Sequence, residues 1–235
     1  MAITLLTFDL DNTLWATTPV IIKAEQTLHQ WLLDNCPEVC ERFNPKQLLD
    51  ARKEYAKLHP DLAHRLSTLR LNFLEYLINH CGYDNPKSLA QQGFDVFYQA
   101  RQQVTLFDGV LETLQLLSQD YQLGALTNGN ANISLIKLDD YFDFAFSAED
   151  QVAPKPHPAL FHAALAHTSC KADEVIHIGD HHEHDIFGAQ QLGIKTIWIN
   201  LDREVWPGEE TATAEINHLS ELPKAIAIII DNLAE

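Results

Sequence analysis

The chain has 235 residues, which is enough for one large domain or for a core domain with a smaller insert. Hydrophobic residues make up 46% and charged residues 21% of the sequence, a balance that is typical of a folded protein and excludes wholesale disorder. The formal net charge of -17 disfavours nucleic acid and anionic membranes as partners, because both would be repelled.

Cysteine usage and the N-terminus both point to a soluble protein of the cytoplasm. The cysteines are irregularly spaced, without a Cys-x-x-Cys pair, so we expect neither a zinc site nor disulfides: Cys36, Cys40, Cys81 and Cys170. The chain begins with a strand-like segment, and we expect no signal peptide. The longest apolar run, residues 225–230, is too short to span a bilayer.

Short apolar runs alternate with helical patterns over most of the chain. The runs that resemble buried parallel strands are residues 3–8, 123–127, 144–147, 175–179 and 196–199. Helical patterns cover residues 110–119, 132–138, 158–166 and 185–192, and a final helix is expected at 219–233. This alternation predicts an α/β fold with a doubly wound parallel sheet, in which ligands gather outside the carboxyl ends of the strands.

Residues 17–104 have a different pattern, with no convincing strand. Apolar residues recur at helical spacing, as in Ile21, Ala24 and Leu28. Prolines fall where helices could start or stop: Pro19, Pro45, Pro60 and Pro86. We predict a helical insert over 17–104 and a core formed by residues 1–16 and 105–235.

Two carboxylates directly follow the first expected strand. Asp9 and Asp11 would repel each other, but both stay ionised if a divalent cation lies between them. Asp9 could then attack phosphorus, and Asp11 could protonate the leaving oxygen and later activate water. Thr13 could cap the following turn. The alternative is an ordinary turn that follows a strand.

Two later segments could bind a phosphoryl group. The Thr127 hydroxyl and the backbone N–H of Asn128 lie at a strand end before a helix, where they could hold phosphate oxygens. Asn-Gly also makes an ordinary turn, which remains the alternative. Lys155 stands between Pro154 and Pro156, which fix the backbone, and its ammonium could neutralise phosphate and the nucleophile. The alternative for Lys155 is a solvated loop side chain.

A second acidic cluster follows the strand at 175–179. Asp180 would complete an oxygen-ligand set with Asp9, and Asp185 could hold a metal-bound water or orient Lys155. Oxygen ligands favour magnesium. Three neighbouring histidines could also bind zinc, but the oxygen ligands argue against it, and the three could simply be exposed loop residues: His181, His182 and His184.

The order of these motifs resembles the haloacid dehalogenase superfamily. That superfamily carries Asp-x-Asp-x-Thr, a strand-terminal Ser/Thr, a Lys, and Gly-Asp with a further acid. The matching residues here are Asp9-Leu10-Asp11-Asn12-Thr13, Thr127, Lys155, and Gly179-Asp180 with Asp185. The resemblance implies a Rossmann-like core with a small helical cap at 17–104. It also implies a magnesium-dependent phosphatase that acts on a small phosphorylated metabolite through an aspartyl-phosphate.

The resemblance also assigns roles. Asp9 would be the nucleophile and a metal ligand, and Asp11 the acid/base, which also ligates the metal through its backbone carbonyl. Asp180 would bind Mg²⁺ directly and Asp185 through water. The phosphoryl group would be bound by Thr127 and Lys155. Asp11 disfavours dehalogenation, because the dehalogenase branch lacks an acid at that position. Many relatives carry a second Asp after Gly-Asp where this chain has His181, so the metal set must rest on Asp180 and Asp185.

Three segments resemble bacterial phosphatases of riboflavin synthesis more closely: residues 7–14, 60–73 and 126–131. Those relatives act on 5-amino-6-(5-phospho-D-ribitylamino)uracil, often with side activity on flavin mononucleotide. The resemblance implies that cap residues set this preference, with His64, Arg65 and Arg70 as candidates. The alternative is that these three are ordinary surface charges.

Two other functions remain open on the sequence alone. A sugar phosphomutase would share Asp9 and Asp11 but return the phosphoryl group to a sugar. A non-catalytic binding or regulatory protein could keep the fold without the reaction, although no catalytic position is lost. As partners we expect a small phosphorylated substrate and no nucleic acid or membrane, with the chain a monomer or a homodimer.

Overall fold

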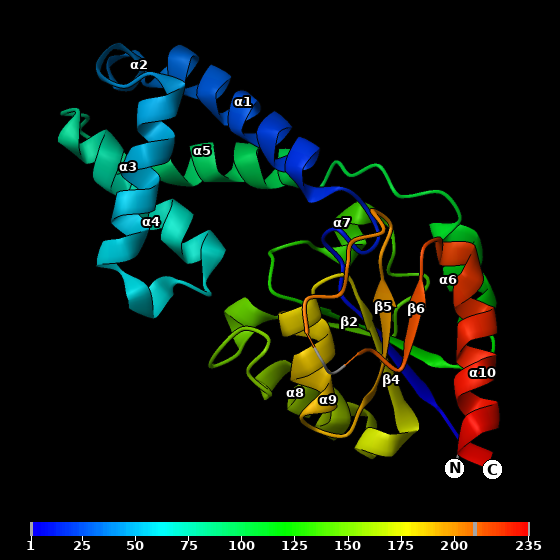
Figure 1. Ribbon diagram of the computed structural model, residues 1–235. Coiled ribbons are helices and arrows are strands. Elements are labelled where there is room, and N and C mark those ends of the chain that lie inside the picture. Colours follow the sequence, from blue (N-terminus) through cyan, green and yellow to red (C-terminus); the bar gives the residue numbers. More distant parts are fainter. Residues whose placement is uncertain (1, 209–210, 235) are drawn as a thin grey trace. The chain divides into compact units, whose positions relative to one another are not determined.

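The computed structural model describes residues 2–208 and 211–234, and it divides into two compact units (Figure 1). The core unit comprises Met1–Ala16 and Thr105–Glu235, and the helical unit comprises Thr17–Val104. Each unit has its own hydrophobic core, and each is described separately below.

The core unit contains a six-stranded, all-parallel sheet in the order β3-β2-β1-β4-β5-β6. The strands are β1 (Leu5–Phe8), β2 (Gln122–Thr127), β3 (Phe144–Ser147), β4 (Val175–Gly179), β5 (Lys195–Ile199) and β6 (Ala214–Ile216). β1 lies between β2 and β4, so the strand order reverses beside it. Ligands of such sheets bind at this reversal, outside the carboxyl ends of the strands.

Helices cover both faces of the sheet, as expected for a doubly wound fold (Figure 1). α8 (Ala159–Thr168) and α9 (Gly188–Gln190) lie on one face, and α6 (Val110–Leu117) and α10 (Leu222–Ala234) on the other. β1 and β4 are buried along their whole length, which explains their nearly continuous apolar sequence. The predicted fold class is confirmed.

Three details of the core unit differ from the sequence prediction. β6 was not predicted, because its three residues are too short to give a periodic signal. The helix expected at 185–192 begins earlier, as a π-helix at His182–Phe187, because the His181 side chain accepts hydrogen bonds from the N–H groups of Glu183 and His184. α7 (Ile133–Ile136) ends where Lys137 adopts a left-handed conformation with φ of 66°.

The helical unit is built from five α-helices: α1 (Thr17–Asn35), α2 (Pro37–Arg42), α3 (Pro45–Leu58), α4 (Leu66–His80) and α5 (Pro86–Arg101). Prolines occupy the first position of α2, α3 and α5, where a missing N–H costs nothing. Across 2–208 and 211–234, no helix combines the length and the apolar character that crossing a membrane requires.

Candidate active site

Lys155 and Asp9 form the centre of a buried cluster at the carboxyl ends of β1 and β4. The Asp9 backbone N–H continues the β1–β4 ladder by donating to Ile178 O at 2.8 Å, which sets Asp9 beside Gly179 and Asp180. Lys155 Nζ donates to Asp9 Oδ1 at 2.8 Å, to Asp185 Oδ1 at 2.6 Å and to Leu126 O at 2.5 Å. All three donors of the ammonium are therefore used, and the lysine does not face solvent.

Asp185 is held by more contacts than any other carboxylate of the cluster. Its Oδ1 accepts from Lys155 and contacts His177 Nε2 at 3.2 Å, and its Oδ2 accepts from the His181 N–H at 3.0 Å. Burial alone would raise the pKa of Asp185, but Lys155 and His177 outweigh it and hold the pKa well below its usual value. Asp185 is therefore ionised, and Oδ2 keeps one lone pair for a further partner.

His177 and Thr7 support Asp185, and the sequence reasoning missed both. His177 lies in β4 and is fully buried, with Nδ1 2.8 Å from Thr7 Oγ1 in β1. Burial lowers the pKa of His177, so the ring is neutral. Because the Asp185 carboxylate can only accept, Nε2 carries the proton and Nδ1 accepts from the Thr7 hydroxyl. The sequence feature that could have revealed this support is the histidine that interrupts the apolar run of β4.

Asp180 is positioned from two sides. Thr13 Oγ1 lies 3.1 Å from Asp180 Oδ1 and 3.3 Å from Asp9 Oδ2, so this buried hydroxyl stands between two carboxylates instead of only capping a turn. Trp198 Nε1 donates to the Asp180 carbonyl at 2.6 Å. Nothing in the local sequence signals this contact, because Trp198 comes from the neighbouring strand β5.

Two backbone positions allow the carboxylates to approach each other. Asn12 has φ of 63°, a left-handed conformation that asparagine tolerates better than most residues, and it lies between Asp11 and Thr13. Gly179 lies against Asp185: a Cβ atom at this position would come within 2.4 Å of Asp185 Cγ. Only glycine leaves room for Asp185 where the structure places it.

Replacing Gly179 by alanine is therefore expected to displace Asp185 and, with it, Lys155. Disturbing such supporting contacts typically lowers metal affinity or activity by roughly 10- to 100-fold, which steady-state kinetics and calorimetric titration with Mg²⁺ would measure. Gly208→Ala is the matched control, because its Cβ would meet only an ordinary contact, 3.5 Å from Trp206 Nε1. Unchanged kinetics in Gly179→Ala would contradict the tight packing described for Asp185.

Thr127 and Asn128 close the β2 side of the cluster. Thr127 is buried at the end of β2, and its Oγ1 accepts from the Gly129 N–H at 2.9 Å. The Asn128 side chain binds the Lys155 backbone in both directions, accepting from its N–H at 2.7 Å and donating to its carbonyl at 2.9 Å. The amide side chain of Asn128 thus fixes Lys155, a role that the sequence reasoning did not assign.

Asp11 stands slightly apart from the buried carboxylates. Its Oδ1 accepts from Trp15 Nε1 at 3.0 Å, and the residue is half-buried. The oxygen atoms that lie within 4.8 Å of one another belong to Asp9, Asp180 and Asp185, so the Asp11 carboxylate is not part of that group. Because Asp11 is only half-buried, its carboxylate stays accessible to water and to a bound substrate.

The charges of the cluster fit a divalent cation. One ammonium and three carboxylates leave two negative charges in excess when all are ionised. Burial raises the pKa of Asp9 well above its usual value, against the pull of Lys155, and burial with the Asp185 charge raises the pKa of Asp180 to about 6. A divalent cation would cancel these two excess negative charges. The three converging carboxylates would also supply the oxygen ligands that a hard cation prefers.

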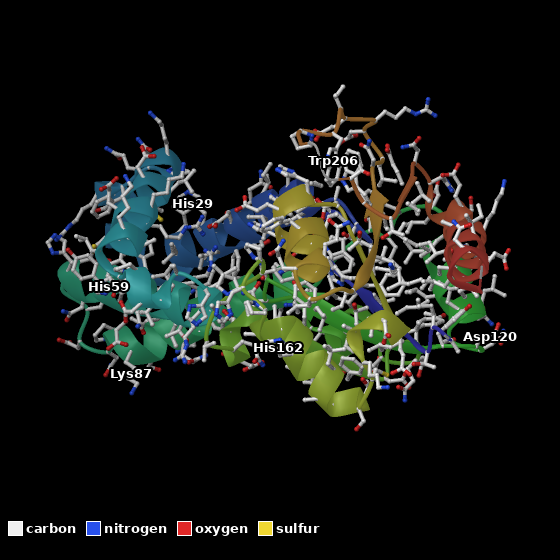
Figure 2. All side chains as sticks on the ribbon, turned by 60° about the horizontal axis from the view of Figure 1, so that its bottom comes forward. His29, His59, Lys87, Asp120, His162 and Trp206 are labelled. Carbon is white, nitrogen blue, oxygen red and sulfur yellow. The ribbon has the colours of Figure 1, made fainter. Side chains whose placement is uncertain are left out.

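The neighbouring histidines are arranged differently. The ring of His181 stacks on His184 with centroids 3.8 Å apart and on His182 with centroids 5.0 Å apart. Trp206, labelled in Figure 2, lies edge-on to His182, with the ring centroids 6.2 Å apart. Within the described parts of the chain, none of these imidazoles joins a cluster of metal-ligating atoms.

The three candidate specificity residues lie at the start of α4. His64 is half-buried, and its Nε2 is enclosed without a hydrogen-bond partner among the described residues. Arg65 is exposed and precedes the helix. Arg70 pairs with Glu25 at 2.8 Å, and its guanidinium lies 3.4 Å above the Phe97 ring. Arg70 is therefore not an ordinary surface charge.

Comparisons with known proteins agree with this geometry. Residues 6–199 match the family described as haloacid dehalogenase-like hydrolase. The 5-amino-6-(5-phospho-D-ribitylamino)uracil phosphatase YigB of Escherichia coli (strain K12) is 26% identical over 230 residues, covering 95% of this chain and 96% of that protein. The glyceraldehyde 3-phosphate phosphatase of Pyrococcus furiosus is 28% identical over 229 residues, covering 94% of this chain and 91% of that protein.

A solved structure gives a second kind of match. The 2-haloacid dehalogenase from Pseudomonas syringae pv. Tomato DC3000 is 40% identical, with a TM-score of 0.91, covering 96% of this chain and 99% of that chain. The predicted superfamily and the prediction of an enzyme are confirmed by these matches. The chain therefore belongs to the haloacid dehalogenase-like hydrolase family.

Proposed function

We propose that this hydrolase is a magnesium-dependent phosphatase that cleaves small phosphomonoesters through an aspartyl-phosphate at Asp9. The observation that carries the proposal is the convergence of Asp9, Asp180 and Asp185 around Lys155 at the ends of β1 and β4. The named curated relatives are phosphatases, which supports the same class of reaction. The helical unit would serve as the cap that excludes water.

Each side chain has a role in this reaction. Asp9 is the nucleophile of this proposal, as the resemblance of Asp9-Leu10-Asp11-Asn12-Thr13 to the first motif of the family implies, and its side chain is 10% exposed while that of Asp185 is 2% exposed. Its oxygen would form a bond to phosphorus as the ester P–O bond breaks, and Asp11 would give a proton to the leaving oxygen. Asp11 would then take a proton from water, whose oxygen attacks phosphorus and returns Asp9 to its free form.

Positive charge must balance the phosphoryl oxygens and the nucleophile. Lys155 would supply one charge, held in place by Asp185 and by the side chain of Asn128. Asp9, Asp180 and the Asp11 carbonyl would hold Mg²⁺ directly, and the remaining lone pair of Asp185 Oδ2 would reach it through water. When bound, Mg²⁺ would neutralise developing charge on the transferring group. Thr127 and the Asn128 N–H would bind phosphoryl oxygens.

The 40% identity to a protein named as a dehalogenase makes dehalogenation the rival activity. Dehalogenases of this family lack an acid at the position of Asp11, so Asp11 favours phosphate transfer. Parallel assays with p-nitrophenyl phosphate and 2-chloropropionate separate the two activities. We expect phosphate release that EDTA abolishes, and no chloride release. Chloride release without phosphate release would replace the phosphatase assignment.

The finer substrate follows from the resemblance to phosphatases of riboflavin synthesis. We propose 5-amino-6-(5-phospho-D-ribitylamino)uracil or flavin mononucleotide as substrate, with His64, Arg65 and Arg70 setting the preference. Arg70 is paired with Glu25, so His64 and Arg65 are the first residues to vary. Ranking phosphorylated metabolites by kcat/KM at saturating Mg²⁺ tests this choice. A sugar phosphomutase would instead convert a hexose 1-phosphate without releasing phosphate.

Magnesium is expected to stabilise the protein more at about pH 8 than at about pH 5, because protons compete for the same carboxylates. The pKa of Asp180 is raised to about 6 in the folded, metal-free protein. This folded protein therefore binds a proton at Asp180 as the pH falls through 6, whereas the unfolded chain binds that proton only at lower pH. At saturating Mg²⁺, about 100 times Kd, the gain in unfolding free energy is roughly 2.7 kcal/mol.

Thermal unfolding with and without Mg²⁺ across this pH range measures the effect. Comparing the two scans at each pH cancels the titration of groups away from the site. In the Asp180→Asn variant, Mg²⁺ should increase the unfolding free energy only slightly at every pH. A gain that is equal at both ends of the range in the natural protein would contradict Asp180 as a ligand.

A further inference from the structure

The helical unit contains a second candidate binding site, a cavity of about 360 Å³ walled by α1, α3 and α4. Its lining is almost entirely apolar and includes Ile21, Leu28, Leu48, Leu49, Phe73 and Leu77. Every lining residue belongs to the helical unit, so the cavity is a feature of that unit alone. Its volume falls within the range of small-molecule pockets and far exceeds the voids left between packed core side chains.

Three charged side chains line this cavity: Glu25 from α1, Arg52 from α3 and Arg70 from α4. Arg70 Nη2 donates to Glu25 Oε1 at 2.8 Å, and Arg52 Nη1 donates to the same oxygen. Two guanidinium groups thus share a single carboxylate oxygen, which leaves one positive charge uncompensated. This excess is notable in a chain whose formal net charge is -17.

The positive charge is held where water reaches it poorly. The Arg70 side chain is 12% exposed and the Arg52 side chain 24% exposed. Burial lowers the pKa of Arg70 to about 10 even though Glu25 favours its charged form, and the nearby Arg52 lowers it further. A partly buried cation beside a second cation is stabilised by another anion. In the described contacts, each guanidinium donates to Glu25 through one of its nitrogens, so the other N–H groups of Arg52 and Arg70 can donate to a ligand.

We propose that this cavity binds an amphiphilic monoanion, with an aliphatic body among the leucine and isoleucine side chains and a carboxylate at Arg52 and Arg70. The single excess charge matches a carboxylate, whose planar oxygens fit the guanidinium fork. The walls match an alkyl chain, because they offer few polar groups to hydrogen-bond a polar body. His29, labelled in Figure 2, lies in the α1 wall and is the remaining titratable group of the lining.

Decanoate is the probe, and calorimetric titration of the full chain without Mg²⁺ or phosphoester is the measurement. The proposal predicts saturable binding of one decanoate per chain, weaker binding of decanol by at least about tenfold, and no binding of decyltrimethylammonium. Arg52→Gln should remove the preference for decanoate over decanol. Because no turnover is involved, the result is independent of the proposed phosphatase activity.

A variant that fills the cavity provides a second test of the proposal. Leu49→Trp should abolish binding of both decanoate and decanol by occupying the cavity. Leu58→Trp is the matched control, because Leu58 lies on the same helix, is 77% exposed and is not part of the lining, so binding should be unchanged. Equal affinity for decanoate and decyltrimethylammonium, or undiminished binding by Leu49→Trp, would overturn the proposal. The proposal would also be overturned if the natural protein formed a dimer that Leu49→Trp dissociates, because the cavity would then bind a second copy of the chain.

Discussion

Replacing Asp9 by asparagine is expected to lower kcat for p-nitrophenyl phosphate by at least roughly 10⁴-fold, because removing a nucleophile eliminates the reaction path itself. Asp9 occupies the point where Lys155, Thr13 and the end of β1 meet. The amide keeps the shape of the side chain but cannot attack phosphorus. Steady-state kinetics at saturating Mg²⁺ measures the loss.

The same substitution should make the metal-free protein more stable. With all of its groups ionised, the cluster has two excess negative charges, and the raised pKa of Asp9 shows that burial and the charges of Asp180 and Asp185 disfavour the Asp9 carboxylate, so replacing it by a neutral amide relieves this repulsion. Asp120→Asn, at an exposed position of the core unit, should change neither property (Figure 2). Turnover close to normal in Asp9→Asn would eliminate Asp9 as nucleophile.

Replacing Lys155 by methionine is expected to destabilise the metal-free protein by roughly 3–5 kcal/mol, the usual cost of removing one partner from a buried ion pair. The lysine side chain is 1% exposed, and its ammonium contacts both Asp9 and Asp185. Methionine fills a similar volume, so the effect reports the lost charge. We also expect KM to rise and kcat to fall together, since the ammonium would contact the phosphoryl group and the nucleophile.

Chemical unfolding and kinetics together test this prediction. Lys87→Met is the matched control, because Lys87 is exposed in the helical unit and should have no effect (Figure 2). Asp185→Asn should cost less stability in the Lys155→Met background than in the natural protein, since the two charges stabilise each other. If Lys155→Met unfolded at the same denaturant concentration as the natural protein, the ion pairs would contribute nothing.

Residues at strand ends could be predicted from the sequence. Buried parallel strands have nearly continuous apolar sequences, so the acids that follow β1 and β4 were recognisable as groups at one edge of a sheet. That Asp9 lies beside Gly179 depends on the register of β1 against β4, which no local pattern encodes. The doubly wound fold was predictable for the same reason, from strands that alternate with helices.

The supporting contacts were less predictable because they come from distant parts of the chain. Trp198 reaches Asp180 from β5, and the Asn128 side chain binds the Lys155 backbone across two loops. Thr7 and His177 face each other only because their strands pair in register. The cavity of the helical unit depends likewise on how three helices pack, which helical periodicity does not determine.

Trapping the phosphorylated enzyme tests the central claim most directly. Acid quenching during turnover of p-nitrophenyl phosphate with Mg²⁺, followed by peptide mass spectrometry, should show one phosphoryl group on Asp9 that hydroxylamine removes, as expected for an acyl phosphate. EDTA and Asp9→Asn should each abolish the adduct. A phosphoryl group on another residue, such as His181, or turnover with no adduct at any time, would contradict nucleophilic attack by Asp9.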